Sequence, residues 1–347
     1  MLLVIAESVP LAPLTTLGLG GRARCFAEVT DRAQVAPALA WARERSLPVF
    51  ILGGGSNLVV ADHGFPGLVL RMRTRGRHWS EASGEARVEV AAGEPWDEVV
   101  ADAVVRTAAG IECLAGIPGS AGAAPVQNIG AYGQELASAV RHVRVLDRQS
   151  LEERTLDAAA CGFGYRDSLF KQQPERFAIL SLTLGLAQGG PPSVRYPELA
   201  AALSGTPTLP EVRRAVLALR RKKGMVLDET DPDHRSAGSF FVNPIVAPAL
   251  ADDIAARAGK DLPRFPLPDG RVKLAAGWLI ERAGIARGFR LGPVGVSSKH
   301  ALALVHHGGG STQQLLALAL HVRKAVLDRF GVSLSPEPVF LGLAWPG

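Results

Sequence analysis

The chain has 347 residues, of which 47% are hydrophobic and 20% are charged. This length is enough for roughly two or three domains, and the composition is that of an ordinary globular protein that is slightly hydrophobic. The formal net charge of +5 and the pI of about 9.4 favour anionic ligands, but the basic residues are too dispersed to indicate nucleic-acid binding.

The cysteines and the apolar runs argue against disulfide-rich, metal-binding, secreted and membrane-spanning proteins. Cys25, Cys113 and Cys161 are odd in number and form no CxxC pair, so we expect neither a disulfide framework nor a metal site. The apolar run at residues 2–6 has no basic residue before it and is typical of a strand or a disordered lead rather than a signal peptide. No run approaches the roughly 18 apolar residues of a membrane span. We therefore expect a cytoplasmic protein without a membrane partner.

The first half of the chain alternates helices, strands and glycine-rich turns. Val35, Leu39 and Ala42 share one face of a helix predicted over residues 34–45, and Pro37 fits there only if the helix begins just before it. The other elements predicted in this half are, in order, strands over 47–52, 58–60, 67–72 and 87–93, and a helix over 95–108 with Pro95 at its first position.

The second half continues the alternation. Thr208 is predicted to cap a helix that has Pro210 at its first position. The polar, acidic stretch 224–235 indicates a crossover between domains. The elements predicted in this half are a hairpin of 143–147 and 153–157, a strand over 177–186, a helix over 208–224, a strand over 301–307 and a helix over 312–330.

The turn "GGGSN" at residues 53–57 suggests phosphate binding. In a Rossmann unit or a P-loop such a turn opens a helix, but here strand-like sequence follows over residues 58–70. The chain also has neither GxGxxG nor GxxxxGK[ST]. A phosphate would therefore be held by a nest of backbone N–H groups in the turns.

A second glycine-rich loop, "GIPGSAGAAPVQNIGAYGQE", runs from residue 116 to 135 and is almost without charge. Its composition fits neither a helix nor an alternating strand, and it lacks the polarity of a disordered segment. Ordered loops of this length are usually binding loops. Its small residues would let the backbone wrap closely around a long, acceptor-rich ligand.

Together the two loops resemble the flavin-binding half of the UDP-N-acetylenolpyruvoylglucosamine reductases, a family of bacterial peptidoglycan synthesis. The similarity continues in order along nearly the whole chain, which makes it highly specific. The five further motifs are "TTLGLGGRARCF" at 15–26, "CGFGYRDSLFK" at 161–171, "SAGSFFVNP" at 236–244, "KLAAGWLIERAG" at 273–284 and "SPEPVF" at 335–340.

The resemblance implies an α+β fold. It implies a vanillyl-alcohol-oxidase-type FAD-binding domain of two α+β subdomains, followed by a C-terminal α/β substrate-binding domain. We expect the FAD-binding region over 1–223, with a split near residue 80 and an inserted loop around 190–200, and the substrate-binding domain over 224–347. Tyr196 in the inserted loop indicates the longer of the family's two subtypes.

The resemblance also implies the activity: NADPH reduces a non-covalently bound FAD, which then reduces UDP-N-acetylglucosamine enolpyruvate to UDP-N-acetylmuramate. Reduction of the enolpyruvyl double bond takes a hydride from flavin N5 at one carbon and a proton at the next, with an enolate between the two events. We expect a monomer whose partner is a nucleotide-sugar substrate, with no nucleic acid.

By the same resemblance, Arg166 and Glu337 stabilise the enolate and Ser239 gives the proton. A guanidinium suits a carboxylate because it stays charged and planar; the alternative for Arg166 is a structural ion pair with Asp167 or another acid. A serine hydroxyl is a poor acid, and Ser239 could instead be the hydroxyl of a turn or cap. Glu337 must be protonated or share a proton, which requires an apolar site that raises its pKa; the alternative is a surface carboxylate in a terminal turn.

The resemblance assigns further residues to the substrate and the cofactor. Lys223 closes a basic run, so the register between Lys222 and Lys223 stays open, and His300 stands where the family often has glutamine. The expected substrate contacts are Tyr165, Tyr196, Lys223, Asn243 and His300. The expected FAD contacts are Gly53, Gly54, Gly55, Ser56, Asn57, Gly116, Ile117, Pro118, Gly119, Ser120, Gly122, Gln127, Asn128, Gly130, Ala131 and Tyr132.

Two other functions remain open. An oxygen-using alcohol or sugar oxidase of the same fold often binds its flavin covalently through a histidine near the first loop, where His63 is the only candidate, but "AGSFF" and "PEPVF" have no place in it. A non-catalytic nucleotide-sugar sensor would not need Arg166, Ser239 and Glu337 together.

Two groups of residues, a run of arginines and a pair of histidines, are interpreted as ordinary surface residues rather than as binding sites. The arginines at positions 71, 73, 75 and 77 share one strand face without aromatic residues between them, which indicates a solvated edge rather than a nucleic-acid patch. His306 and His307 are interpreted as ordinary surface histidines rather than metal ligands.

Overall fold

The computed structural model describes residues 3–82, 84–258 and 261–346, which form two compact units. The first unit contains the described residues of Met1–Val9, Arg22–Gly55 and Phe65–Leu227, and the second contains those of Pro10–Gly21, Ser56–Gly64 and Asp228–Gly347. The sequence predicts a domain boundary between residues 223 and 224, which assigns Pro10–Gly21 and Ser56–Gly64 to the first domain. In the structure these two segments belong to the second unit.

Long-range backbone bonds explain why residues 56–64 join the second unit. Strand β4 (Leu58–Val60) pairs in parallel with β21 (Val339–Leu341). The Asp62 carboxylate accepts hydrogen bonds of 2.7 and 3.0 Å from the backbone N–H groups of Thr312 and Gln313. These two residues open a long helix, so Asp62 satisfies N–H groups that a helix start leaves without a partner.

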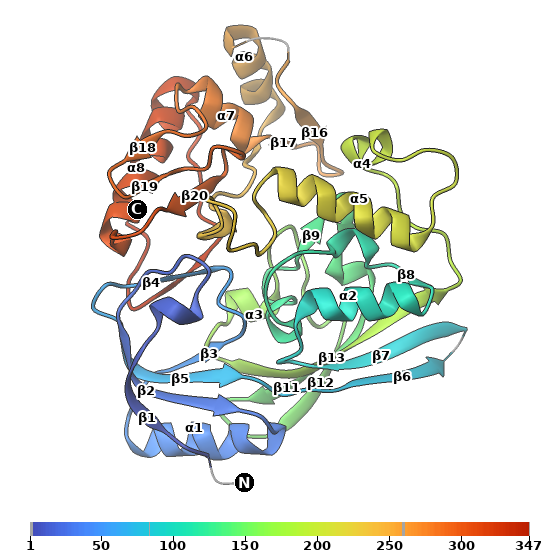
Figure 1. The fold of residues 1–347 in the computed structure, drawn as a ribbon, viewed down its shortest axis with the longest axis vertical. Helices are drawn as coiled ribbons and strands as arrows, with labels where there is room; N and C mark the ends of the chain where they lie inside the picture. The colour runs from blue at the N-terminus through green and yellow to red at the C-terminus, as the bar shows by residue number, and fades with distance from the viewer. Residues whose placement is uncertain (1–2, 83, 259–260, 347) are drawn as a thin grey trace. The chain divides into compact units, whose positions relative to one another are not determined.

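The first unit begins with a four-stranded sheet in the order β1-β2-β5-β3. Both β2–β5 and β3–β5 are parallel. The strands are β1 (Ala6–Pro10), β2 (Arg22–Val29), β5 (Phe65–Met72) and β3 (Val49–Leu52), and helix α1 (Val35–Glu44) packs on their buried side chains (Figure 1). Helix α1 begins two residues before Pro37, the position that a proline tolerates.

An antiparallel sheet follows, in the order β12-β11-β13-β7-β6, with β8 paired to the end of β13. Its central strand contributes to two cores: Ala178 and Leu180 pack into one, Leu182 and Leu184 pack into the other, and a register shift in the pairing with β11 separates the two pairs. The predicted hairpin of β11 and β12 is confirmed. The strands are β6 (Arg77–Ala82), β7 (Glu85–Ala91), β8 (Ala108–Ala109), β11 (Val140–Asp147), β12 (Glu153–Asp157) and β13 (Phe177–Gln188).

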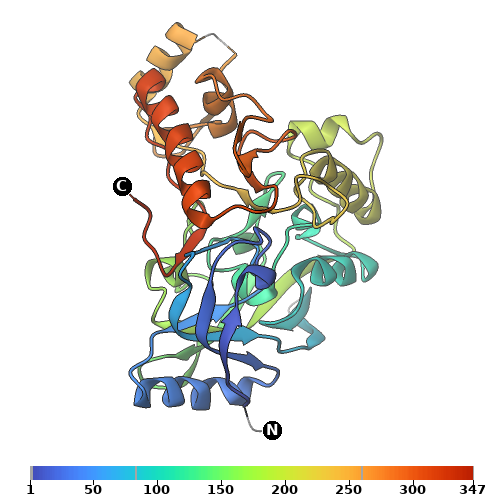
Figure 2. The ribbon, with the colours of Figure 1, turned by 60° about the vertical axis from the view of Figure 1, so that its left-hand side comes forward.

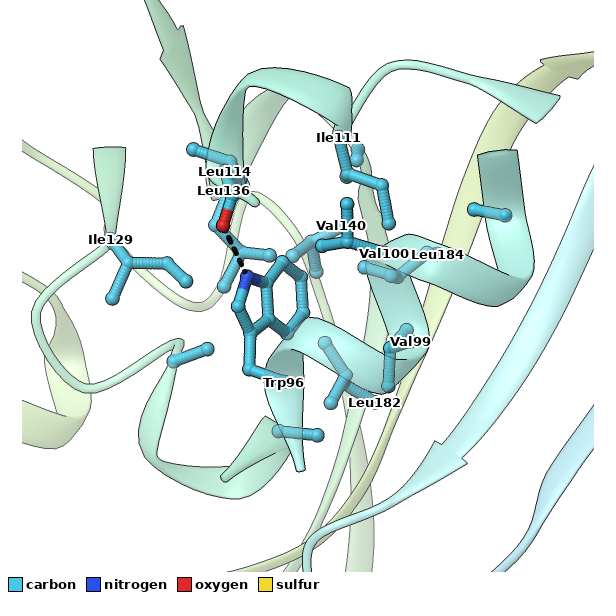
Figure 3. Packing of buried hydrophobic residues seen from close by; sticks show 14 of the residues in the cluster. Trp96, Val99, Val100, Ile111, Leu114, Ile129, Leu136, Val140, Leu182 and Leu184 are labelled. Atoms are coloured by element: carbon cyan, nitrogen blue, oxygen red, sulfur yellow. Dashed lines mark hydrogen bonds between the residues drawn. The ribbon is translucent and has the colours of Figure 1, made fainter. Parts of the chain in front are cut away.

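Helix α2 (Trp96–Val105) covers one face of this sheet, and α5 (Leu209–Lys222) packs on α2 and on the turn Glu112–Leu114 (Figure 1). Trp96 is 1% exposed and donates its indole N–H to Leu114 O at 3.1 Å, in the middle of the apolar cluster drawn in Figure 3. Both helices start one residue off the prediction. Pro95 is the N-cap rather than the first helical residue, and Leu209 takes the first position ahead of Pro210.

Short elements complete the first unit. The second glycine loop contains the small hairpin of β9 (Gly130–Ala131) and β10 (Gln134–Glu135). Two short helices follow later in the chain, α3 (Leu169–Gln172) and α4 (Pro197–Ala201). The 3₁₀ turns of this unit are Arg32–Gln34, Glu112–Leu114, Ala121–Ala123 and Leu136–Ser138.

The second unit packs helices against two small antiparallel sheets. Phe240, Phe241 and Leu318 lie at the centre of its core. One sheet has the order β14-β20-β19-β18, and the other has the order β15-β17-β16. The bounds are β14 (Ser236–Ser239), β15 (Ile245–Val246), α6 (Pro248–Ala258), β16 (Arg264–Pro266), β17 (Val272–Leu274), α7 (Ala276–Arg282), β18 (Arg290–Leu291), β19 (Val294–Val296), β20 (Ala303–His306) and α8 (Thr312–Phe330), with a 3₁₀ turn at Ala12–Leu14.

Helix α8 has the bounds that the sequence predicts. Ser311 caps its start, where the Ser311 hydroxyl accepts from Gln314 N, and Gly331 ends it in the left-handed conformation with φ of 69°. Figure 2 shows α8 in side view, with its length exposed on one side and packed on α7 and the sheet on the other. None of the described helices is long and apolar enough to cross a membrane.

His306, which the sequence analysis places on the surface, is instead a buried side chain that links three segments of the second unit. Its Nδ1 lies 3.1 Å from Leu17 O, and Gly310 N donates to its Nε2 at 3.0 Å. These partners fit the neutral ring that carries its proton on Nδ1. Burial lowers the pKa of His306 below 6.5, and the charge of Arg235 lowers it further, against the opposing effect of the bond to Leu17.

We expect the free energy of unfolding to fall when the pH drops below 6.5. The folded-state pKa of His306 lies below the unfolded value of 6.5, so the unfolded chain takes up the proton first, and the stability that is complete above pH 6.5 is lost on acidification. Urea unfolding between about pH 8 and pH 5 measures this slope. His306→Gln should have a shallower slope, with the remainder due to His307, whose pKa is also lowered; equal slopes would contradict the assignment.

Candidate active site

The two glycine loops of the first unit contact each other directly. A Cβ atom at Gly54 would lie only 2.6 Å from Gly119 Cα, and a Cβ atom at Gly53 would overlap Ser120 Oγ. Side chains are therefore excluded at both positions by the neighbouring loop. Part of the glycine content that the sequence suggested for cofactor contact serves to pack one loop against the other.

The second loop is ordered by its own hydrogen bonds. Whereas its composition predicted neither helix nor strand, it contains a 3₁₀ turn at Ala121–Ala123 and the β9–β10 hairpin. Gly116 N donates to Asp97 Oδ1 at 2.7 Å, and Gly122 N donates to Ala92 O at 2.8 Å. Because these two N–H groups are already used, Gly116 and Gly122 contribute the shape of the loop rather than hydrogen bonds to a ligand.

Ser120 offers a buried hydroxyl to a ligand. Its side chain is 7% exposed, and its Oγ has no hydrogen-bond partner among the described residues. Buried polar atoms of this kind are rare because each costs free energy. A phosphate or another acceptor of a bound dinucleotide would satisfy the hydroxyl, so this cradle of small residues fits an FAD.

Arg166 is fixed by the second loop. Its Nη2 donates to Gly130 O at 2.7 Å, and its Nη1 donates to Asn128 O at 3.3 Å. Its guanidinium carbon lies 5.7 Å from the centre of the Tyr165 ring. The φ angle of Arg166 is 54°, and Asn128 and Tyr132 also have positive φ values, of 43° and 47°. Strained backbone of this kind clusters at functional sites.

The Asn128 side chain holds the loop rather than a ligand. Its amide nitrogen donates to Glu135 Oε2 at 3.1 Å and to Gly164 O at 2.9 Å, and its Oδ1 accepts from Ala137 N at 2.9 Å. Both amide hydrogens are thus committed within the protein. Asn128 therefore positions Gly164, two residues before Arg166, and its predicted FAD contact would have to come from its backbone.

The inserted segment brings Tyr196 to the end of α5. The rings of Tyr132 and Tyr196 meet edge to face, with centroids 5.6 Å apart and planes at 87°. Lys223 Nζ lies 5.6 Å from the centre of the Tyr132 ring and 2.6 Å from Glu198 Oε2. Lys222, in contrast, is exposed. This arrangement favours Lys223 over Lys222 as the lysine of the site.

Both phenols of this cluster stay protonated at neutral pH. Burial raises the pKa of Tyr132 to about 12, and the charges of Glu198 and Tyr196 raise it as well, while Arg220 opposes them. Burial and Glu198 also raise the pKa of Tyr196. Tyr196 can therefore donate its hydroxyl proton to a phosphate oxygen.

Glu112 is a buried residue that the sequence did not single out. Its carboxylate accepts from Ser193 N at 2.7 Å, Gln134 Nε2 at 2.8 Å and Gly110 N at 2.7 Å. Ser193 lies three residues before Tyr196, so Glu112 anchors the segment that carries the tyrosine. A single glutamate ahead of the second glycine loop gives no sequence signal of this role.

Ser239 and Glu337 lie on neighbouring chain segments of the second unit. Glu337 N donates to the carbonyl of Phe240, the residue after Ser239, at 2.8 Å. Asn57 is bound to the same segment: its Nδ2 donates to Glu337 O at 3.3 Å, and its O accepts from Val339 N at 3.0 Å. Arg166, the third predicted catalytic residue, belongs to the first unit.

The turn beside Ser239 uses a different serine. Ser236 Oγ accepts from Gly238 N at 3.3 Å, and a register shift separates Ser236 from Ser239 in the pairing of β14 with β20. Ser236 Oγ therefore forms a turn of its own, ahead of Ser239.

The remaining predicted residues divide between the two units. Asn243 Oδ1 accepts from Ala276 N at 2.9 Å and so caps α7, and the backbone N–H of His300 donates to Ser297 Oγ at 3.3 Å. The predicted FAD contacts between residues 116 and 132 lie in the first unit together with Gly53, Gly54, Gly55, Tyr165, Tyr196 and Lys223. The second unit contains Ser56, Asn57, Asn243 and His300.

The arginines at positions 71, 73, 75 and 77 do not share one strand as predicted: Arg71 lies in β5, Arg77 opens β6, and the two between them lie in neither strand. Arg71 pairs with Glu28 at 3.0 Å, and Arg75 and Arg77 approach the buried Glu94 at 3.6 and 3.7 Å. His63 is exposed. Within the described residues no group of three His, Cys, Asp or Glu side chains could hold a metal ion.

Comparisons with known proteins agree along the chain. Residues 23–152 match the family model of an FAD binding domain, and residues 231–341 match that of the UDP-N-acetylenolpyruvoylglucosamine reductase C-terminal domain. The reductase of Thermobifida fusca is 45% identical over 97% of this chain and 98% of its own length. The reductase of Saccharopolyspora erythraea is 47% identical over 96% of this chain and 95% of its own length.

A solved structure supports the fold. The UDP-N-acetylenolpyruvylglucosamine reductase of Thermus caldophilus superimposes with a TM-score of 0.66 at 24% identity, over 98% of this chain and 100% of that one. The predicted α+β fold with an FAD-binding domain is thereby confirmed. Full-length identity to several reductases, together with both family models, shows that the chain belongs to the UDP-N-acetylenolpyruvoylglucosamine reductases, a family of FAD-dependent oxidoreductases.

Proposed function

We propose that the protein takes its electrons from NADPH and reduces UDP-N-acetylglucosamine enolpyruvate to UDP-N-acetylmuramate for peptidoglycan synthesis. The observation that carries this proposal is the joining of the Ser239 and Glu337 segments through the bond from Glu337 N to Phe240 O. An oxidase of the same fold has no use for a hydroxyl and a carboxyl in that arrangement. We further propose that the protein works as a monomer in the cytoplasm.

The bound FAD would supply the hydride. The residues proposed to hold it are those of the two glycine loops, with Ser120 Oγ as a side-chain donor that has no hydrogen-bond partner among the residues that the structure describes. Because Gly53 and Gly54 exclude side chains, the loops form a surface of backbone and small groups that a long cofactor can approach closely.

The chain's own residues would supply the rest of the chemistry. Arg166, held by two loop carbonyls, would bind the substrate carboxylate and hold negative charge in the enolate. Ser239 would give a proton to the enolate carbon, and Glu337 in its protonated form would donate a hydrogen bond to the enolate oxygen. Lys223 and Tyr196 would bind the diphosphate as cation and as hydroxyl donor.

Anaerobic stopped-flow spectroscopy of the purified yellow protein tests the proposal. NADPH should bleach the flavin absorption, and UDP-N-acetylglucosamine enolpyruvate should restore it without oxygen. Restoration by oxygen but not by the enolpyruvyl compound would instead support an oxidase. A protein that binds UDP-sugars but whose flavin is never bleached would support a sensor.

A further inference from the structure

Arg220, near the end of α5, is a buried cation that the proposed roles do not use. It is 8% exposed, and its Nη2 donates to Met225 O at 2.7 Å. Its Nε is buried and has no hydrogen-bond partner in the part of the chain that the structure describes. Nor does any described carboxylate form an ion pair with it. A buried charge in this state is costly to the folded protein.

Two other arginines with a buried, unpartnered Nε are different in kind. Arg87 pairs with Glu85 at 3.7 Å, and Arg213 pairs with Asp97 at 2.7 Å. The charge of each arginine is thus balanced by a carboxylate, even though its Nε makes no hydrogen bond. Asp97 also raises the pKa of Arg220 through its charge, but both of its oxygens are already occupied by Arg213 and by Gly116 N. Arg220 therefore lacks an acid of its own.

The surroundings of Arg220 indicate what its unused donor would meet. A Cβ atom on Gly116 would lie 3.4 Å from Arg220 Nε. Tyr132 and Arg166 are among the groups whose charges act on Arg220, and burial lowers its pKa to about 10. Gly116 and Tyr132 are the two ends of the stretch proposed to bind FAD, and Arg166 binds the same stretch. The guanidinium therefore adjoins the loop where a ligand rich in acceptors is expected.

We propose that Arg220 is a further FAD-binding residue, whose Nε–H donates to an oxygen of the bound cofactor. This inference rests on the proposed use of FAD. A cofactor oxygen would satisfy the Nε donor and reduce the cost of the buried charge in one step. The guanidinium would keep its bond to Met225 O, which orients it at the end of α5.

Titration of the full chain, freed of flavin, with FAD tests the proposal. In Arg220→Met, the dissociation constant of FAD, followed by flavin fluorescence, should rise about 10- to 100-fold, the effect of losing a hydrogen bond from a charged donor. Arg220→Lys retains the charge without the Nε donor and should bind FAD less tightly than the native chain and more tightly than Arg220→Met. Arg221→Met removes an exposed arginine of the same helix end and should bind FAD as the native chain does.

Melting of the flavin-free chains separates this role from a structural one. Because Arg220→Met removes an unmatched buried charge, the flavin-free variant should melt no lower than the native flavin-free chain. A lowered melting temperature with an unchanged dissociation constant would make Arg220 structural and overturn the inference. If Arg220→Met does not fold, native affinity in Arg220→Lys would overturn it equally. If the native chain does not bind FAD, the proposed function itself is refuted. If the native chain binds FAD and the Arg220 variants bind it equally well, only the inference about Arg220 is refuted.

Discussion

Replacing Ser239 by alanine should leave the reduction of the flavin by NADPH intact and slow its reoxidation by the enolpyruvyl substrate about 10²- to 10⁴-fold, the usual contribution of a positioned proton donor. The hydroxyl is the only group removed. The adjacent turn rests on Ser236 Oγ and Gly238 N, so the backbone at Ser239 should keep its shape. Anaerobic stopped-flow traces of the two half-reactions measure the two rates separately.

Ser335→Ala is the matched control for Ser239→Ala. Ser335 is exposed, lies two residues before Glu337, and receives Val242 N through its backbone carbonyl, which the substitution retains. It should reoxidise at the native rate. If Ser239→Ala also reoxidised at the native rate, Ser239 would have no part in proton transfer, and Glu337 would become the candidate donor.

Replacing Arg166 by methionine should lower the rate of reoxidation by the substrate about 10²- to 10³-fold, the typical cost of removing one group that stabilises a developing anion. A second effect follows from the bonds to Asn128 O and Gly130 O, which only the native guanidinium makes. Losing them should loosen the second glycine loop, so the purified variant should also retain less FAD. The two readouts are the reoxidation rate per bound flavin and the flavin content.

Arg166→Lys separates the charge of Arg166 from its geometry. Lysine retains a positive charge but cannot bind two carbonyls through a planar fork. If charge dominates, Arg166→Lys should regain most of the reoxidation rate while its flavin content stays low. Native reoxidation per bound flavin in Arg166→Met would exclude Arg166 from enolate stabilisation.

Local chemistry predicted the elements best where their ends carry distinctive residues. Helix α8 has the predicted bounds because Ser311 caps its start and Gly331 ends it with a left-handed residue. Helix α2 shows the limit of such reasoning. A proline is compatible with both the N-cap and the first helical position, and Pro95 is the N-cap because its ψ of 128° is extended.

Long-range contacts could not be predicted in the same way. Nothing local to Asp62 indicates that its carboxylate caps a helix 250 residues later. Glu112 is likewise a lone acid in the sequence, and its anchoring of Ser193 emerges only from the fold. Such contacts depend on the path of the chain rather than on residue type, so they are visible only once the sheets are assembled.

The sequence motifs identified the residues of the proposed site, whereas the contacts of individual side chains in it became known only from the structure. The motif around Asn128 suggested a cofactor contact, whereas the amide binds Glu135 and Gly164 O. The basic run 220–223 predicted a substrate lysine, but it did not predict that Arg220 is buried. Neighbouring cations on one helix are of similar residue type, and only the fold determines which of them faces the core.

The parallel pairing of β4 with β21 bears on how the chain matures during synthesis. Asn57 and Glu337 are bonded although 280 residues separate them, and contacts of such high sequence separation are made late because a large loop must close first. While the ribosome is still translating the middle of the message, residues 58–60 lack the strand β21 with which they pair. The nascent second unit therefore cannot complete this pairing until residues 339–341 have been translated, and a chaperone that shields residues 56–64 could act throughout that interval.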